Sequence, residues 1–242
     1  LNEMIANGEF TADEAKIGYV GAFTYAEVIS GYTSFFLGVR SVCPTATMKV
    51  TFTGSWYDET AEQEGAQKLI QNGCKLISQH ADSMGAPTAC ETAGVPDVSY
   101  NGSTEAACPN TYLISSRIDW APYYEYAIKA AMNGDAIDAD WTGTLATGSV
   151  VLTDLNTAVA AEGTAEAIAA ATEKLEKGEL HVFDTATFTT RADDTMNAFK
   201  VDFLKVDADG HVTSYLADVD TDQAYAGDTE VCLLYTSPSP RD

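Results

Sequence analysis

Short apolar runs alternate with longer amphipathic segments along the first 134 residues of the chain. The runs are typical of buried strands, whereas the amphipathic segments repeat apolar residues with the period of a helix. Strands are predicted at residues 16–23, 48–54, 75–79, 98–100 and 111–116. Helices are predicted at residues 26–42, 59–72, 85–93 and 122–133. Because strand and helix recur about every 25 to 30 residues, the sequence predicts an α/β fold with a mainly parallel sheet flanked by helices.

The pattern becomes less regular after Trp141. An irregular strand and loop are predicted at residues 144–156, a surface helix at 162–177 and a strand at 181–188. A hairpin is predicted at 205–215, with Asp-Gly at its turn, a dipeptide that favours tight turns. The regular repeat of strand and helix is therefore confined to the first part of the chain.

Composition and charge exclude several classes of protein. The 242 residues are 45% hydrophobic and 20% charged, which is typical of a globular protein. The 13 Lys and Arg residues against 36 Asp and Glu give a formal charge of -23, which would repel phosphate backbones and anionic lipid head groups. Apolar runs such as residues 150–152 are far shorter than the roughly 20 residues that span a bilayer. We therefore expect neither a nucleic-acid partner nor a membrane-spanning helix.

The sequence contains none of the common catalytic or cofactor motifs. Walker, dinucleotide-binding, HExxH and GxSxG patterns are absent, and the three histidines lie in separate predicted elements. Carboxylates at residues 207–209 match a calcium loop only in part, so a hairpin is the favoured interpretation there, and those at 218–222 have Gln223 where a calcium loop needs Gly. We therefore expect a non-enzymatic protein that needs no metal and no cofactor.

The two ends of the chain are unusual. It begins at Leu1 rather than at Met, so a signal peptide or a lipid-attachment cysteine would lie outside it. Residues 232–242 differ in composition from the acidic chain before them and resemble translated adapter sequence. We interpret this segment as a foreign tail and set Cys232 aside, with a native Pro/Ser-rich tail as the alternative.

The other four cysteines lack the CxxC spacing of a zinc site. Cys43 and Cys74 each precede a predicted strand, and Cys90 and Cys108 flank the next one. These positions favour two disulfides, Cys43 with Cys74 and Cys90 with Cys108, which would require an oxidising, extracytoplasmic compartment. Four buried free thiols are the alternative.

Polar and aromatic residues follow every predicted strand of the repeat. Open α/β sheets bind ligands in the crevice beyond the carboxyl ends of their strands, so these residues are the candidate site. The candidates are Ser55, Trp56, His80, Asp82, Ser83, Tyr100, Asn101, Asp119 and Trp120. Planar rings beside Asp, Asn and His suit a flat heteroaromatic ligand that is stacked on its faces and hydrogen-bonded at its edges. Trp56 follows a strand that we expect to be central in the sheet, and packing in the core is the alternative to ligand stacking.

Four segments carry a resemblance to a known family. They are Lys16-Ile-Gly-Tyr-Val-Gly-Ala-Phe23, Gly54-Ser-Trp-Tyr-Asp58, Ile77-Ser-Gln-His-Ala-Asp-Ser83 and Asp119-Trp-Ala-Pro-Tyr-Tyr124. In order and spacing they resemble the motifs of the basic membrane lipoprotein family, also called purine nucleoside receptor-like. Its members are substrate-binding proteins of ABC importers. The resemblance runs from about residue 1 to residue 231.

The resemblance implies a type I periplasmic-binding-protein fold with two lobes. Family members are tethered outside the membrane by an N-terminal lipid, bind purine nucleosides or bases between the lobes, and deliver them to an ABC permease and its ATPase. On this alignment residues 1–15 are the end of an inter-lobe helix and a linker, and residues 16–150 form the second ligand-binding lobe. Residues 151–231 complete that lobe, cross the hinge and return in part to the first lobe, whose opening βα units would lie outside the chain.

The resemblance also implies roles for single residues. Trp56 falls where the family places an aromatic residue that stacks on the purine, and the loop with His80, Asp82 and Ser83 falls on positions that line the base and sugar. Asn101 also falls on this lining, but nucleoside-binding relatives tend to have Asp there. They also tend to have Lys near the position of Asp119. These departures do not fit a nucleoside site, and the chain more closely resembles relatives with the Trp-containing motif, which are associated with a free base such as adenine; the resemblance leaves base and nucleoside both open.

The leading hypothesis is therefore an extracytoplasmic solute receptor of an ABC importer that binds a purine base or nucleoside. The alternative is a ligand-sensing module of the same fold, either a chemoreceptor partner or the effector domain of a regulator, without a role in transport. An α/β enzyme with catalytic residues outside this chain is the third possibility. Fold alone does not separate these classes.

Overall fold

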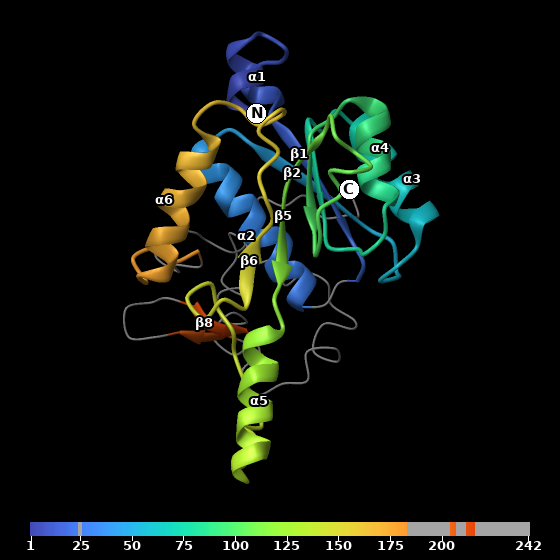
Figure 1. Cartoon of the computed structure of the whole chain (residues 1–242). Coiled ribbons are helices and arrows are strands. Elements are labelled where there is room, and N and C mark those ends of the chain that lie inside the picture. The colour runs from blue at the N-terminus through green and yellow to red at the C-terminus, as the bar shows by residue number, and fades with distance from the viewer. Residues whose placement is uncertain (24–25, 183–203, 207–211, 216–242) are drawn as a thin grey trace.

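A computed structural model describes residues 1–23, 26–182, 204–206 and 212–215, and Figure 1 shows its architecture. A sheet of six strands has the order β2-β1-β3-β4-β5-β6. The strands are β1 (Lys16–Gly21), β2 (Thr47–Phe52), β3 (Leu76–Gln79), β4 (Asp97–Tyr100), β5 (Tyr112–Ile118) and β6 (Val150–Leu152). The longer helices are α2 (Ala26–Val42), α3 (Glu59–Gln71), α4 (Gly85–Ala93), α5 (Ala121–Asn133) and α6 (Thr164–Glu176).

The first five strands are parallel to their neighbours, and only the pairing of β6 with β5 is antiparallel within this sheet. The predicted α/β class with a mainly parallel sheet is confirmed. The predicted central position of the strand before Trp56 is wrong, because β2 is an edge strand. The reason is that β1 pairs with both β2 and β3, so the chain adds β2 on one side of β1 and all later strands on the other.

Helices cover both faces of the sheet. Alternate residues of β1 point to opposite faces, as in any strand. Ile17 and Tyr19 pack with Phe36 and other residues of α2, whereas Val20 packs with residues of α3 and α4 such as Leu69. In Figure 1, α2 accordingly lies on one side of the strands and α3 and α4 lie together on the other. Burying each large apolar side chain of these two clusters contributes about 1.5–3 kcal/mol to stability.

The four cysteines correct one of the predictions, because all of them are buried free thiols in the structure. Cys43 follows α2 and packs in a small cluster with Phe10, whereas Cys74 follows α3 and packs in the cluster of α3 and α4. The two helices cover opposite faces of the sheet, so the proposed Cys43–Cys74 bridge would have to join two separate clusters. Cys90 and Cys108 lie on segments that contact each other, but they also carry no disulfide.

Smaller elements surround the sheet. The chain begins with a short helix α1 (Asn2–Ala6) and a 3-10 turn η1 (Ala12–Glu14). Strands β7 (Leu204–Val206) and β8 (Val212–Tyr215) pair antiparallel, which confirms the predicted hairpin, although its turn lies outside the described residues. The strand predicted at 181–188 also lies almost wholly outside them. No helix in the described ranges combines the length and hydropathy needed to cross a membrane.

Candidate functional site

The loops after β1, β2, β3 and β4 meet at one edge of the sheet, which we call the carboxyl edge. They bring four rings together, Phe23, Trp56, His80 and Tyr100, which we call the aromatic row. The ring centroids of Phe23 and Trp56 lie 5.2 Å apart, those of Trp56 and His80 lie 5.9 Å apart, and those of His80 and Tyr100 lie 4.5 Å apart. The row crosses the point where the strand order reverses, between β1 and β3, which is where open α/β sheets bind ligands.

The loop before α3 presents Trp56. Gly54 has a φ of 74°, a left-handed conformation that glycine adopts without strain. The Ser55 hydroxyl donates to the carbonyl of Tyr57 at 3.1 Å, so it shapes this turn. Trp56 is 37% exposed, which leaves part of its indole open to a ligand. Asp58 caps α3 by accepting the N–H of Ala61 at 3.0 Å, and its role is therefore structural.

His80 is the most enclosed polar group of the aromatic row, since only 8% of it is exposed. Its backbone N–H donates to the carbonyl of Val20 at 2.9 Å, and its ring stacks on Tyr100 with an interplanar angle of 26°. Burial lowers the pKa of His80 below its ordinary value, and the nearby carboxylate of Asp82 opposes that shift. The imidazole is therefore neutral near pH 7. Its Nδ1 is a buried atom without a hydrogen-bond partner within the described part of the chain.

The two residues that follow in this loop differ in their placement. Asp82 is exposed, and its backbone N–H donates to the carbonyl of Trp56 at 2.8 Å. Ser83 is 3% exposed, and its hydroxyl accepts the N–H of Gly85 at 3.1 Å at the start of α4. Asp82 is thus a charged group beside the aromatic row, while Ser83 shapes the loop.

Tyr100 and Asn101 end β4. Burial raises the pKa of Tyr100, and the carboxylates of Glu27 and Asp82 add to this shift, so its phenol stays protonated. Asn101 is exposed and has a φ of 67°, a conformation that Asn tolerates better than most residues. Its backbone N–H donates to the carbonyl of Ser116 on β5 at 2.8 Å. This bond holds the backbone of Asn101 at the carboxyl edge, directly after Tyr100 at the end of the aromatic row.

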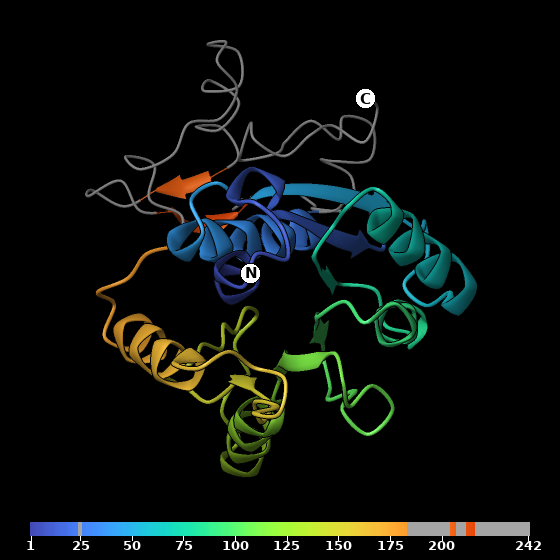
Figure 2. The ribbon, with the colours of Figure 1, turned by 90° about the horizontal axis from the view of Figure 1, so that it is seen from above.

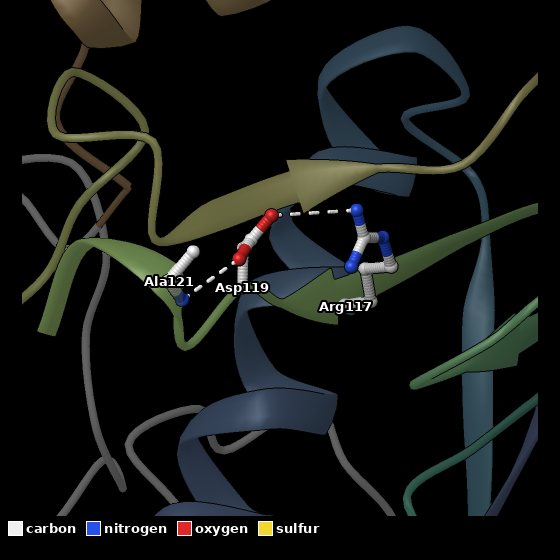
Figure 3. A network of polar contacts seen from close by, with 3 residues as sticks. All are labelled: Arg117, Asp119 and Ala121. Atoms are coloured by element: carbon white, nitrogen blue, oxygen red, sulfur yellow. Dashed lines mark hydrogen bonds and ion pairs between the residues drawn. The ribbon is translucent and has the colours of Figure 1, made fainter. Parts of the chain in front are cut away.

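Asp119 and Trp120 lie on the connection from β5 to α5, apart from the aromatic row. Figure 3 shows the Asp119 carboxylate between two partners of its own chain. One oxygen accepts the N–H of Ala121 at 2.9 Å, and the other lies 3.5 Å from the Arg117 guanidinium. Trp120 stacks on Tyr124 of α5, with ring centroids 6.2 Å apart. The structure therefore gives these two predicted site residues local partners on α5 and β5.

Two residues of the site were missed by the sequence analysis. Phe23 is the last residue of the strand predicted at 16–23 and is not among the candidates, although an aromatic residue at a strand end is itself the signal. Glu62 is a fully buried carboxylate whose oxygens reach both the loop after β2 and the loop after β3. Its signal was its spacing, because Glu62 stands four residues before Ala66 and seven before Leu69 on the buried stripe of α3.

The carboxyl edge combines groups suited to holding a flat polar molecule. It offers an indole face, a neutral imidazole, a phenol, a carboxylate and an amide within a few loops. Among the residues that the structure describes, no three His, Cys, Asp or Glu side chains gather as metal ligands would. Stacking and hydrogen bonding are therefore the interactions that this part of the chain supplies.

Comparisons with known proteins agree with this arrangement. Residues 9–182 match the model of a family described as ABC transporter substrate-binding protein PnrA-like. A protein of Haloferax volcanii that is named as an ABC transporter glucose-binding protein is 35% identical over 179 residues, which cover 74% of this chain and 45% of the relative. A purine-binding protein of Brucella abortus is 34% identical over 117 residues, which cover 48% of this chain and 33% of the relative.

The chain thus spans less than half the length of these curated relatives. A solved ABC transporter solute-binding protein of Conexibacter woesei superposes on it with a TM-score of 0.58 at 26% identity, over 69% of this chain and 56% of that one. The fold is accordingly that of the type I periplasmic binding proteins. Since the family model matches well over half of the sequence, the chain belongs to the PnrA-like family of ABC transporter substrate-binding proteins.

Proposed function

We propose that this protein is the extracytoplasmic solute-binding component of an ABC importer, and that its carboxyl edge binds a purine base or nucleoside. The observation that carries this proposal is the aromatic row, in which a partly exposed indole lies beside a stacked His-Tyr pair and the carboxylate of Asp82.

In this proposal the groups of the carboxyl edge hold a purine by stacking and by hydrogen bonds. The indole of Trp56 stacks on the face of the base, where aromatic rings gain most from offset contact. Asp82 accepts hydrogen bonds from an exocyclic amine, and the amide of Asn101 both donates and accepts at the edge of the ring. His80 is neutral, so it places no charge beside the ligand, and its ring supports Tyr100 by stacking. A carboxylate and an amide with no basic side chain among them favour a neutral ligand that carries N–H donors, as adenine does.

The mechanism follows from binding between two lobes. A ligand that contacts both lobes stabilises their closed arrangement, because it binds that arrangement more tightly than the open one. The closed form is then recognised by the permease, and the ATPase drives release into the cell. In this proposal an N-terminal lipid holds the protein at the outer surface of the membrane.

A monosaccharide is the second candidate ligand. The relative with the longer match is named as a glucose-binding protein. A sugar ring stacks its C–H face on an aromatic ring, and carboxylates and amides such as Asp82 and Asn101 hold its hydroxyls. The carboxyl edge therefore suits either a purine or a monosaccharide. Specificity depends on which polar groups of the ligand form hydrogen bonds with Asp82 and Asn101.

A ligand screen decides between the two classes. The complete gene product is heated with adenine, guanine, adenosine or glucose, and the shift in its melting temperature is recorded. A ligand present at 100 times its Kd adds about 2.7 kcal/mol to stability, which is a readily measured shift. We expect the largest shift with adenine. A shift with glucose alone would replace the purine by a sugar, and no shift with any purine would contradict the proposal.

A further inference from the structure

Glu62 is the only acidic side chain of α3 that is buried, and it carries two hydrogen bonds within the described structure. It is fully buried, and burial of a carboxylate is costly unless hydrogen bonds replace its lost water. One oxygen accepts the backbone N–H of Asp58 at 3.0 Å, and the other accepts the backbone N–H of Ser83 at 3.0 Å. Asp58 ends the loop after β2, and Ser83 belongs to the loop after β3. One side chain therefore joins two loops of the carboxyl edge.

Other contacts fix the same two loops to each other. The N–H of Asp82 donates to the carbonyl of Trp56 at 2.8 Å. The amide of Gln79 donates to the carbonyls of Ala81 at 2.9 Å and Ser83 at 3.2 Å, which holds the second loop in a tight curve. A Cβ at Gly85 would lie only 2.2 Å from the carbonyl oxygen of Glu59, so α4 begins pressed against α3. Glu62 stands at the centre of this packing.

We propose that Glu62 is a positioning residue that holds Trp56 and Asp82 at a fixed separation, so that the indole face and the carboxylate meet the same ligand. Glu62 itself is buried beneath the loops and does not touch the ligand. This inference rests on the proposed function only in taking Trp56 and Asp82 as ligand contacts. The hydrogen-bonding role of Glu62 is independent of which ligand is bound.

The chemistry of the site requires a carboxylate at this position. Both partners are N–H donors, and only a carboxylate offers an acceptor to each of them without presenting a donor. Gln has the same shape, but its NH₂ group would face one of the two N–H groups and leave it unpaired. Glu62→Gln should therefore release one of the loops, although it preserves volume and removes a buried charge.

The first test uses the unaltered protein. Hydrogen exchange is followed by NMR without ligand, and the amides of Asp58, Asp82 and Ser83 are compared with that of His80, which pairs with β1. We expect protection at these loop amides to be within about tenfold of that at His80. Exchange at the rate of open loops would show that the two loops are not held together, and it would overturn the proposal without any variant having to fold.

The second test compares Glu62→Gln with Glu64→Gln, which removes the same charge from an exposed position on the same helix. In Glu62→Gln we expect protection to fall at least tenfold at Asp82 and Ser83 while it is retained at His80, and affinity for adenine to fall at least tenfold. Glu64→Gln should change neither. Equal loss of protection over the whole sheet would make Glu62 a general stability residue, and unchanged protection in the two loops would also overturn the inference. Failure of the unaltered protein to bind adenine would instead count against the proposed function, because the exchange measurement does not depend on a ligand.

Discussion

Strands β1 to β4 and strands β5 to β6 differ sharply in how deeply their residues are buried. Strands β1 and β3 are buried along nearly their whole length, and α4 buries five of its nine residues. In β5, burial fades toward the carboxyl end, and β6 is largely exposed. Of the 13 residues in α5 only Ala130 is buried, and α6 contributes no buried residue to the described structure. We call β1–β4 with α2–α4 the inner half, and β5, α5, β6 and α6 the outer half.

The outer half also exposes large apolar side chains. Figure 1 shows α5 projecting away from the sheet, and Figure 2 shows α5 and α6 set apart from α3 and α4. The large hydrophobic residues exposed between residues 118 and 152 are Ile118, Trp120, Tyr124, Ile128, Met132, Ile137, Val150 and Leu152. The inner half, in contrast, packs helices on both faces of its strands. The aromatic row therefore stands on the half of the molecule that has its own core, which is where a binding geometry can be held rigidly.

The largest expected difference between the halves concerns stability. Phe36 of α2 is 1% exposed and packs in the inner core, whereas Met132 of α5 is 81% exposed. Phe36→Ala should lower the free energy of unfolding by about 3–5 kcal/mol, because it leaves a cavity among close-packed side chains. Met132→Ala should change it by less than about 0.5 kcal/mol. Urea unfolding followed by circular dichroism measures both. Similar losses in the two variants would show that α5 is as well packed as α2.

A pH titration tests the enclosure of the inner half through Asp97. Asp97 lies on β4 without exposed surface, and burial raises its pKa to about 7, although a hydrogen bond from Ser99 opposes the shift. In the unfolded chain its pKa is about 4. The fold therefore favours the protonated form. The contribution of Asp97 to stability is fully present below about pH 4 and is lost as the pH rises through 7, by an amount on the order of 4 kcal/mol.

Asp97→Asn removes this titration and keeps the shape of the protonated acid. The variant should gain stability relative to the unaltered protein between pH 4 and pH 8, as measured by urea unfolding at each pH. Cys90 of α4 and Cys108 of the loop between β4 and β5 face Asp97. Burial raises the pKa of both thiols, so they stay protonated over this range. Glu91 also acts on Cys108 from the surface of α4, and Glu91→Gln is the control for its charge. Parallel pH curves for the unaltered protein and Asp97→Asn would contradict the assignment.

The bounds of helices and strands in the inner half were predicted well from the sequence, but the pairing of the strands was not. Helix α2 at 26–42 and helix α4 at 85–93 have the predicted bounds, because apolar periodicity and a capping residue such as Gly94 act locally. Periodicity does not say which strand pairs with which, so the edge position of β2 was not foreseen. The same limit explains the error over Cys43 and Cys74, since their pairing depended on which face each preceding helix covers.

Prediction of the site was limited in a similar way. Trp56, His80 and Tyr100 were foreseen as strand-end residues, and the structure brings their rings together. The sequence did not separate residues that face outward from residues that shape the loops. Ser55 and Ser83, for example, are predicted ligand contacts, and the structure adds that both hydroxyls make hydrogen bonds within the loops.

Trp56 is the residue of the inner half that we propose to stack on the ligand. Trp56→Ala should remove stacking worth about 1–3 kcal/mol, so affinity for adenine should fall between roughly fivefold and two-hundredfold. Stability without ligand should change by less than the roughly 3–5 kcal/mol expected for a buried Trp, because the side chain is partly exposed. Trp56→Phe should restore most of the affinity, since it keeps a ring face. Calorimetry on the complete gene product measures these affinities.

Tyr57→Ala is the matched control for Trp56, because Tyr57 is the next residue in the same loop and is 65% exposed. We expect its affinity for adenine to stay within about twofold of the unaltered protein. A large loss of unliganded stability in Trp56→Ala with unchanged affinity would make Trp56 a core residue. Equal losses of affinity in both variants would show that the loop as a whole, rather than the indole, contacts the ligand.

The smallest effect is expected at Asp119, where the outer half meets the carboxyl edge. Its side chain is 34% exposed and that of Arg117 is 43% exposed, so their ion pair is worth at most about 1 kcal/mol. Asp119→Asn keeps an acceptor for the N–H of Ala121 and should change stability by less than that amount, whereas Asp119→Ala also removes the acceptor and should cost about 0.5–2 kcal/mol. Because both oxygens already have partners in the chain, affinity for adenine should stay within about twofold in Asp119→Asn. A tenfold loss of affinity with unchanged stability would instead place this carboxylate on the ligand, as the sequence predicted, and would extend the site from the inner half across β5.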